Sequence, residues 1–157
     1  MKACIILLAS VVGYKVAETS LFTNPMIFQF CEDIQNTFKT TVLDAIELLP
    51  CKMIQRKSKN RICNVDTSEF YGRTVTVHRG TEVWTEIQLS DRLLNYPNTM
   101  NNVVLHELLH SIGLKHSDQP GIMNYSVLTQ RNSILEDRRV LWLSEDDIMG
   151  LYYLLHH

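Results

Sequence analysis

The sequence predicts a single α+β domain, and three observations lead to that fold class. The chain has 157 residues, a length that suits one domain with a substantial hydrophobic core. Short apolar or alternating segments that are typical of strands lie at 25–30, 73–78 and 83–90. Longer segments with apolar residues at helical spacing lie at 33–49, 103–111 and 144–155. We find no internal repeat, low-complexity tract or second domain in the sequence.

The first thirteen residues predict a secretory signal peptide. One lysine precedes an apolar run that is too short to span a bilayer. Cleavage after Gly13 agrees with the preference for small residues, whereas cleavage after Ala17 is less favourable because Lys15 lies close before it. The competing interpretation is a buried first strand. We therefore expect a signal peptide over 1–13, or up to Ala17, and a secreted domain over 14–157.

The first half of this domain is expected to contain a strand and a long helix. The strand covers the apolar segment 25–30. The helix covers 33–49, where apolar residues recur at helical spacing until Pro50 ends it. The basic segment 52–59 is most simply a solvated loop, and the alternative is a patch that binds a polyanion.

Two further strands and a second helix follow. Val75 and Val77 alternate with polar residues in one strand, and Ile87 and Leu89 do so in the next. We expect the second helix over 103–111. Its N-cap is expected at one of two adjacent asparagines, Asn101 or Asn102.

The cysteines predict one disulfide. Removal of a signal peptide would remove Cys4 and leave Cys31, Cys51 and Cys63, an odd number for an oxidising compartment. Cys31 and Cys51 flank the first predicted helix, whose ends are too far apart to be bridged. We therefore expect Cys51 to pair with Cys63 around a short basic loop, with Cys31 free and buried.

A group of histidines in the second helix predicts a metal site. His106 and His110 are four residues apart, so both imidazoles leave the same face of a helix. Glycine at position 113 permits a sharp turn that can bring His116 back as a third ligand. Three neutral imidazoles with an open fourth position are the ligands of a catalytic zinc, and Glu107 lies beside them as a proton acceptor. The alternative is a buried helix whose histidines are satisfied by hydrogen bonds.

The run from His106 to His116 resembles the zinc-binding motif of the metzincin metalloproteases, His-Glu-x-x-His-x-x-Gly-x-x-His, at every fixed position. Met123 resembles the methionine of the Met-turn that lies beneath the zinc in that family, although alone it would read as a core residue. Ser117 and the segment 143–154 resemble the matrixin branch, the matrix-metalloprotease-like family. Tyr125 departs from matrixins, which usually have proline there.

Tyr125 has two interpretations. Astacins and serralysins carry a tyrosine at this place that reaches the zinc or the oxyanion, so Tyr125 is a candidate extra ligand or oxyanion helper. It can equally be a packed aromatic residue with a local hydrogen bond.

The last helix is also predicted by local chemistry. Ser144 is a good N-cap, and Asp147 stands in the capping-box position. By resemblance, Asp146 and Asp147 support the Met-turn and pair with the mature N-terminus. The apolar residues at helical spacing predict a buried stripe of Ile148, Leu151, Tyr152 and Leu155.

The resemblance implies a metzincin-type (zincin) catalytic domain with a twisted mixed sheet, three main helices and an active-site cleft. It implies a secreted zinc endopeptidase with one zinc ion, in which Glu107 acts as general base and acid on a zinc-activated water. The strand over 83–90 is expected to be the exposed sheet edge on which an extended peptide binds, and the segment 125–141 is expected to line the specificity pocket. The alternatives are a catalytically silent zinc-binding module that captures a protein partner, and a zinc hydrolase for a non-peptide amide.

Composition limits the partners. The net charge of -2 argues against nucleic acid and acidic membranes, so we expect a protein or peptide substrate, no stable membrane insertion and a monomer. Calcium is not indicated, because the sequence shows no ligands for the structural zinc and calcium sites of animal matrixins. A prosegment cysteine and a haemopexin-like domain are not visible either.

Overall fold

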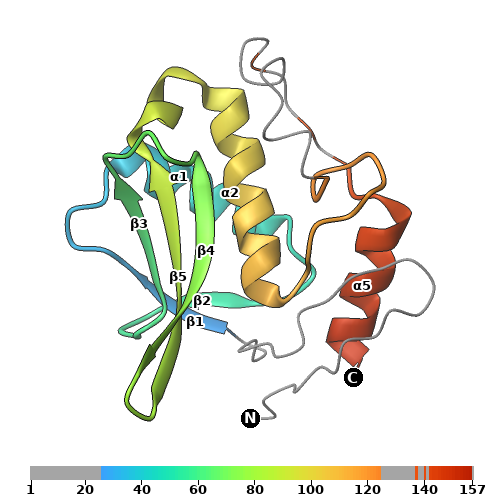
Figure 1. Cartoon of the computed structure of the whole chain (residues 1–157), viewed down its shortest axis with the longest axis horizontal. Coiled ribbons are helices and arrows are strands. Elements are labelled where there is room, and N and C mark those ends of the chain that lie inside the picture. The colour runs from blue at the N-terminus through green and yellow to red at the C-terminus, as the bar shows by residue number, and fades with distance from the viewer. Residues whose placement is uncertain (1–25, 125–136, 138–139, 141, 157) are drawn as a thin grey trace.

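The computed structural model describes residues 26–124, 137, 140 and 142–156. Its elements in chain order are β1 (Met26–Phe30), α1 (Asn36–Glu47), β2 (Met53–Gln55), β3 (Arg61–Val65), β4 (Gly72–Arg79), β5 (Glu82–Ser90), the 3-10 helix η1 (Asp91–Asn95), α2 (Pro97–Ile112) and α5 (Glu145–His156). Within these residues, a five-stranded mixed sheet and three α-helices confirm the predicted α+β fold class (Figure 1). The predicted signal peptide and Tyr125 lie outside the described residues.

The sheet places β4 at one edge. Its strand order is β2-β1-β3-β5-β4, with β4 antiparallel to β5 and every other pair parallel. The expectation that the strand over 83–90 offers a free edge is wrong, because β5 is paired with β3 on one side and with β4 on the other. The hairpin that joins β4 to β5 places β4 on the outer side of β5. Strand β4 therefore forms the edge of the sheet beside α2 (Figure 1).

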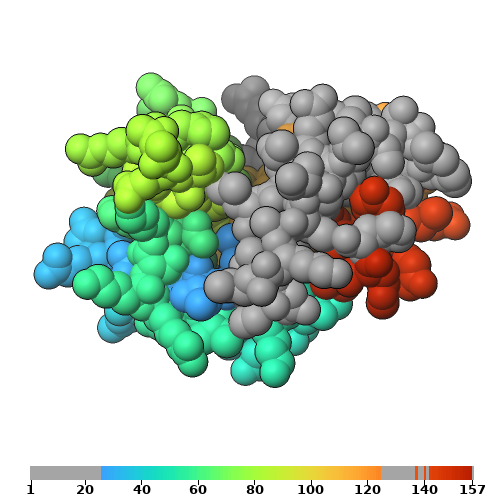
Figure 2. All heavy atoms as spheres, turned by 90° about the horizontal axis from the view of Figure 1, so that it is seen from below, coloured from blue at the N-terminus to red at the C-terminus, as the bar shows by residue number. Residues whose placement is uncertain are grey.

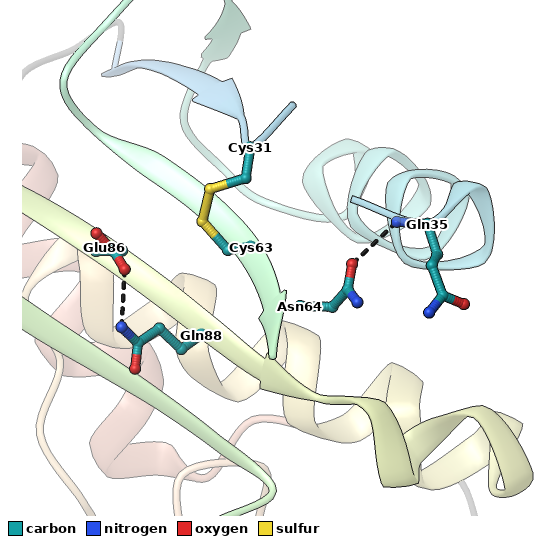
Figure 3. The surroundings of a disulfide bond; sticks show 6 residues. All are labelled: Cys31, Gln35, Cys63, Asn64, Glu86 and Gln88. Atoms are coloured by element: carbon teal, nitrogen blue, oxygen red, sulfur yellow. Dashed lines mark hydrogen bonds between the residues drawn. A yellow bond between two sulfur atoms is a disulfide. The ribbon is translucent and has the colours of Figure 1, made fainter. Parts of the chain in front are cut away.

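One hydrophobic core joins the sheet to α1 and α2. It contains Phe28, Phe38, Val42, Ile62, Ile87, Leu89, Val103, Val104 and Leu108, among others. Helix α1 lies within the predicted range 33–49. The side chain of Asn64 on β3 accepts a hydrogen bond from the Gln35 amide at its start (2.9 Å; Figure 3).

Helix α2 begins six residues earlier than predicted, at Pro97 rather than at residue 103. Proline is favoured in the first turn, and the Thr99 amide is satisfied by the Asp137 carboxylate at 2.8 Å. Asn101 and Asn102 therefore lie inside the helix and do not cap it. The capping group comes from a residue 38 positions away, which a local reading of the sequence does not reveal.

A second core joins the end of α2 to α5. It includes Leu109, Ile112, Leu114, Ile122, Met123, Leu151 and Leu154. In the space-filling view, α5 and the β4–β5 hairpin lie at opposite sides of the molecule's face (Figure 2). Within the described ranges, no helix combines the length and the apolar character that crossing a bilayer requires.

The predicted cap of α5 is confirmed, but its predicted buried stripe is partly wrong. Ser144 Oγ accepts the Asp147 amide at 3.1 Å, and the Asp147 carboxylate accepts the Ser144 amide at 2.9 Å. Ile148 and Tyr152 are exposed by 56% and 64%. The helix is rotated so that Asp146 and Asp147 face inward, because their carboxylates make buried hydrogen bonds.

The predicted disulfide is also wrong. Cys31 pairs with Cys63 (Figure 3), and Cys51 is free and buried among the cysteines that the structure describes. Cys31 directly follows β1, Cys63 lies on the neighbouring strand β3, and the Cys31 amide donates to the Ile62 carbonyl at 3.0 Å. Parallel pairing of these strands brings the two Cα atoms to 5.1 Å, a normal disulfide separation. The prediction failed because it considered the helix and not the pairing of β1 with β3.

Candidate metal centre

Three histidine side chains converge at the C-terminal end of α2. The Nε2 atom of His116 lies 3.0 Å from that of His106 and 3.1 Å from that of His110. All three candidate ligand atoms lie within 4.8 Å of one another. The structure thus brings together the three residues that the sequence nominated as metal ligands.

The chain reverses after α2 through a glycine. Gly113 has a φ of 121°, in the region that favours glycine, and its amide bonds to the carbonyls of His110 and Leu109. The Leu114 amide also donates to the Leu109 carbonyl at 3.1 Å, which closes the turn. The chain then returns His116 to the face of α2 that carries the other two imidazoles.

Backbone carbonyls select the tautomer of two of the histidines. His106 Nδ1 donates to the Ile122 carbonyl at 2.7 Å, and His110 Nδ1 donates to the Leu114 carbonyl at 2.6 Å. A carbonyl oxygen can only accept, so each Nδ1 carries the proton and each Nε2 presents a lone pair. The Nε2 atom of His116 faces both of these lone pairs, so the three ring nitrogens converge. The donor set therefore fits a metal ion that prefers imidazole nitrogen, such as zinc.

Burial keeps these imidazoles neutral. Burial, together with the nearby His110, lowers the pKa of His106 to about 3. Burial likewise lowers the pKa of His110 to about 4. Neutral imidazole is the form that binds a metal, so protons compete weakly for these ligands above pH 5.

Glu107 follows His106 in α2 and is buried, and among the described residues its side chain has one hydrogen-bond partner. Thr74 on β4 donates its hydroxyl to Glu107 Oε2 at 2.6 Å. Burial raises the pKa of Glu107 to about 7, and the hydrogen bond from Thr74 opposes that rise. A carboxyl group with a pKa near neutrality can both take up and release a proton at physiological pH.

The segment of the predicted Met-turn packs under the histidines. Ile122 and Met123 are completely buried, and the Ile122 carbonyl is the group that orients His106. The Ser117 amide donates to the Met123 carbonyl at 2.9 Å, and Asp147 accepts a hydrogen bond from the Met123 backbone. Asp147 therefore supports this turn, as the resemblance implied.

Asp146 also contacts the turn after the third histidine. Its carboxylate accepts the Ser117 hydroxyl at 3.1 Å, and both side chains are buried. The last helix is thereby tied to the residue that follows His116. The pairing of either aspartate with a mature N-terminus stays a prediction.

The sequence did not reveal the role of Thr74. Its contact with Glu107 spans 33 positions. The strand pattern of alternating valines identified β4 but did not show which face α2 covers. Thr74 pairs with buried Ile87, and directly paired residues share a face of a sheet, so Thr74 lies on the face that packs against the helices.

A comparison with protein-family models agrees with this geometry. The model described as Matrixin, of peptidase family M10, matches residues 53–155, which include β2 to β5, all of α2, the three histidines and α5 up to its last residue but one. A search of curated proteins finds no match. The match covers well over half of the chain, from β2 almost to the C-terminus. The chain therefore belongs to the matrixin family of metallopeptidases.

Proposed function

We propose that this protein is a secreted zinc endopeptidase in which Glu107 is the general base and acid. One observation carries the proposal: the ligand atoms of three histidines converge, and the buried Glu107 directly follows the first of them, His106, in α2. A structural zinc site has four protein ligands and needs no neighbouring carboxylate. Three histidine ligands would leave the fourth coordination position of a zinc ion open for water or substrate.

The proposed chemistry divides between the metal and the protein. Zinc, when bound by His106, His110 and His116, supplies the Lewis acidity that lowers the pKa of a water molecule and polarises a peptide carbonyl. Glu107 accepts the proton of the attacking water as the new C–O bond forms. It then delivers that proton to the amide nitrogen as the C–N bond breaks.

The edge strand β4 is the proposed docking strand for the substrate. It pairs with β5 along one side only, within the part of the chain that the structure describes. The unpaired amides and carbonyls of its other side can hydrogen-bond to an extended peptide. Because Thr74 of this strand contacts Glu107, a peptide bound along β4 would pass close to the base.

The Cys31–Cys63 disulfide supports the proposal of secretion. Disulfides form and persist in oxidising compartments, and they are rare where thiols are kept reduced. Tyr125 as an oxyanion helper, the specificity segment 125–141 and the monomeric state remain predictions from the sequence.

The test is to measure zinc content and the cleavage of a quenched-peptide library by the protein. We expect one zinc per chain and cleavage that a chelator abolishes. Glu107→Ala should retain zinc and lose cleavage by about 10³-fold, a typical contribution of general acid–base catalysis. A protein with one zinc that cleaves no peptide would favour the silent zinc-binding module, and cleavage of a non-peptide amide alone would favour the rival hydrolase.

A further inference from the structure

We propose that Thr74 is a positioning residue that holds the Glu107 carboxylate in the orientation for proton transfer. This inference rests on the proposed function of Glu107. It assigns a part in the reaction to the edge strand β4 in addition to peptide docking.

Thr74 is directed at Glu107 by the register of the sheet. It pairs with Ile87, which is buried, and two residues earlier Gly72 pairs with Leu89, which is completely buried. These positions of β4 share the face that α2 covers. From this face the Thr74 hydroxyl lies 2.6 Å from Glu107 Oε2 and 3.0 Å from the Glu107 backbone oxygen.

The side chain of threonine suits this task. Its β-branched carbon restricts rotation about χ1, so the hydroxyl keeps its direction more firmly than one on an unbranched chain. A glutamate side chain has three rotatable torsions, and a bond to Oε2 limits the last of them. Oε1 has no hydrogen-bond donor among the described residues, which leaves it as the oxygen that exchanges the proton.

Gly72 permits the close approach that this contact needs. A Cβ atom at that position would lie 2.5 Å from Val103 Cγ1 and 3.1 Å from Glu107 Cγ, both on α2. A side chain at position 72 would therefore push β4 away from the helix. The small residue and the hydroxyl two positions later together form the strand surface against which Glu107 lies.

The test compares Thr74→Val with Thr74→Ser in the zinc-containing protein. Valine keeps the shape of threonine without the hydroxyl, whereas serine keeps the hydroxyl. We expect Thr74→Val to lower kcat by about 10- to 100-fold, as misplacement of a catalytic group does, with KM changed by less than about 2-fold. Thr74→Ser should recover most of the lost kcat. Zinc content and thermal melting should match the wild type in both.

Thr40→Val is the matched control. Thr40 is exposed in the middle of α1, so the same substitution there should leave kcat, KM and zinc content unchanged. If Thr74→Val does not fold, the crystal structure of the zinc-containing wild type decides, because the proposal requires Thr74 Oγ1 within hydrogen-bond distance of Glu107.

Three results would overturn the role of Thr74 while the peptidase stands. These are an unchanged kcat in Thr74→Val, an equal loss in Thr74→Val and Thr74→Ser, and a change confined to KM, which would place Thr74 in substrate binding alone. A wild type that cleaves no peptide instead removes the proposed function, and with it any role for Thr74.

Discussion

Two regions of the molecule each bury a carboxylate, but they treat it differently. Where α2 faces β4, Glu107 receives one side-chain hydrogen bond from the residues that the structure describes, that of Thr74, and its pKa is raised to about 7. Where α5 faces the turn at Met123, burial also raises the pKa of Asp147, but hydrogen bonds from Ser144 and the Met123 backbone oppose the rise. Several backbone hydrogen bonds keep a carboxylate charged and fix it as part of the structure. A carboxylate with a single donor can exchange a proton more easily.

The largest expected effect tests the Glu107 side of this comparison. Glu107→Gln keeps an oxygen for the Thr74 hydroxyl but removes the proton acceptor, so kcat should fall by about 10³-fold. The free energy of unfolding at pH 8 should not fall, because a charged group is removed from a buried position. Steady-state kinetics measures the first effect and urea unfolding the second. A marked loss of stability would show that the Glu107 carboxylate also stabilises the fold.

The next effect tests Asp147. Asp147→Ala leaves the buried Ser144 and Met123 amides without their acceptor and removes half of the capping box. The free energy of unfolding should fall by about 2 kcal/mol or more. Urea unfolding measures it, and Glu145→Ala at an exposed site of the same first turn is the control. Equal losses in the two variants would contradict the comparison.

A third prediction concerns the pH dependence of stability in the metal-free protein. His106 and His110 have lowered pKa values of about 3 and about 4 in the folded state, so the unfolded state binds more protons below their model value of 6.5. Stability from these groups is present above pH 6.5 and is lost as the pH falls. Glu107 acts oppositely, because its raised pKa lets the folded state take up a proton between pH 7 and 4.5.

The net result is the uptake of roughly one more proton by the unfolded state near pH 5.5. Stability should therefore fall by roughly 1 kcal/mol for each unit of acidification there. Glu107→Gln removes the opposing group, so the fall should steepen to roughly 2 kcal/mol per unit. Urea unfolding in the presence of chelator between pH 5 and 6.5 measures both slopes. Equal slopes would show that Glu107 ionises normally.

The two regions also differ in how far the sequence predicted them. The histidines and Glu107 lie within eleven residues, and the geometry of a helix and one glycine turn is enough to bring them together. The capping box of α5 is local in the same way. These features could be predicted because every contact in them lies within a few turns of chain.

The features that were missed depend on contacts between distant segments. Cys31 meets Cys63 only because β1 and β3 are neighbours, and Thr74 meets Glu107 only because the β4–β5 hairpin folds β4 to the outer edge. The early start of α2 depends on Asp137. Strand order and register are set by the whole sheet, so no local pattern in this chain contained them.

The smallest expected effect follows from the rotation of α5. Spacing alone placed Ile148 in the buried stripe, but the inward hydrogen bonds of Asp146 and Asp147 turn it to the surface, where it is 56% exposed. Ile148→Gln should change the free energy of unfolding by less than about 0.5 kcal/mol, as surface substitutions do. Leu151→Ala, on the buried side, should cost about 2 kcal/mol or more. Urea unfolding of the two variants shows whether the hydrogen bonds of Asp146 and Asp147 or the apolar spacing determine which face of α5 is buried. A large loss of unfolding free energy in Ile148→Gln would show that Ile148 is buried and would contradict the prediction.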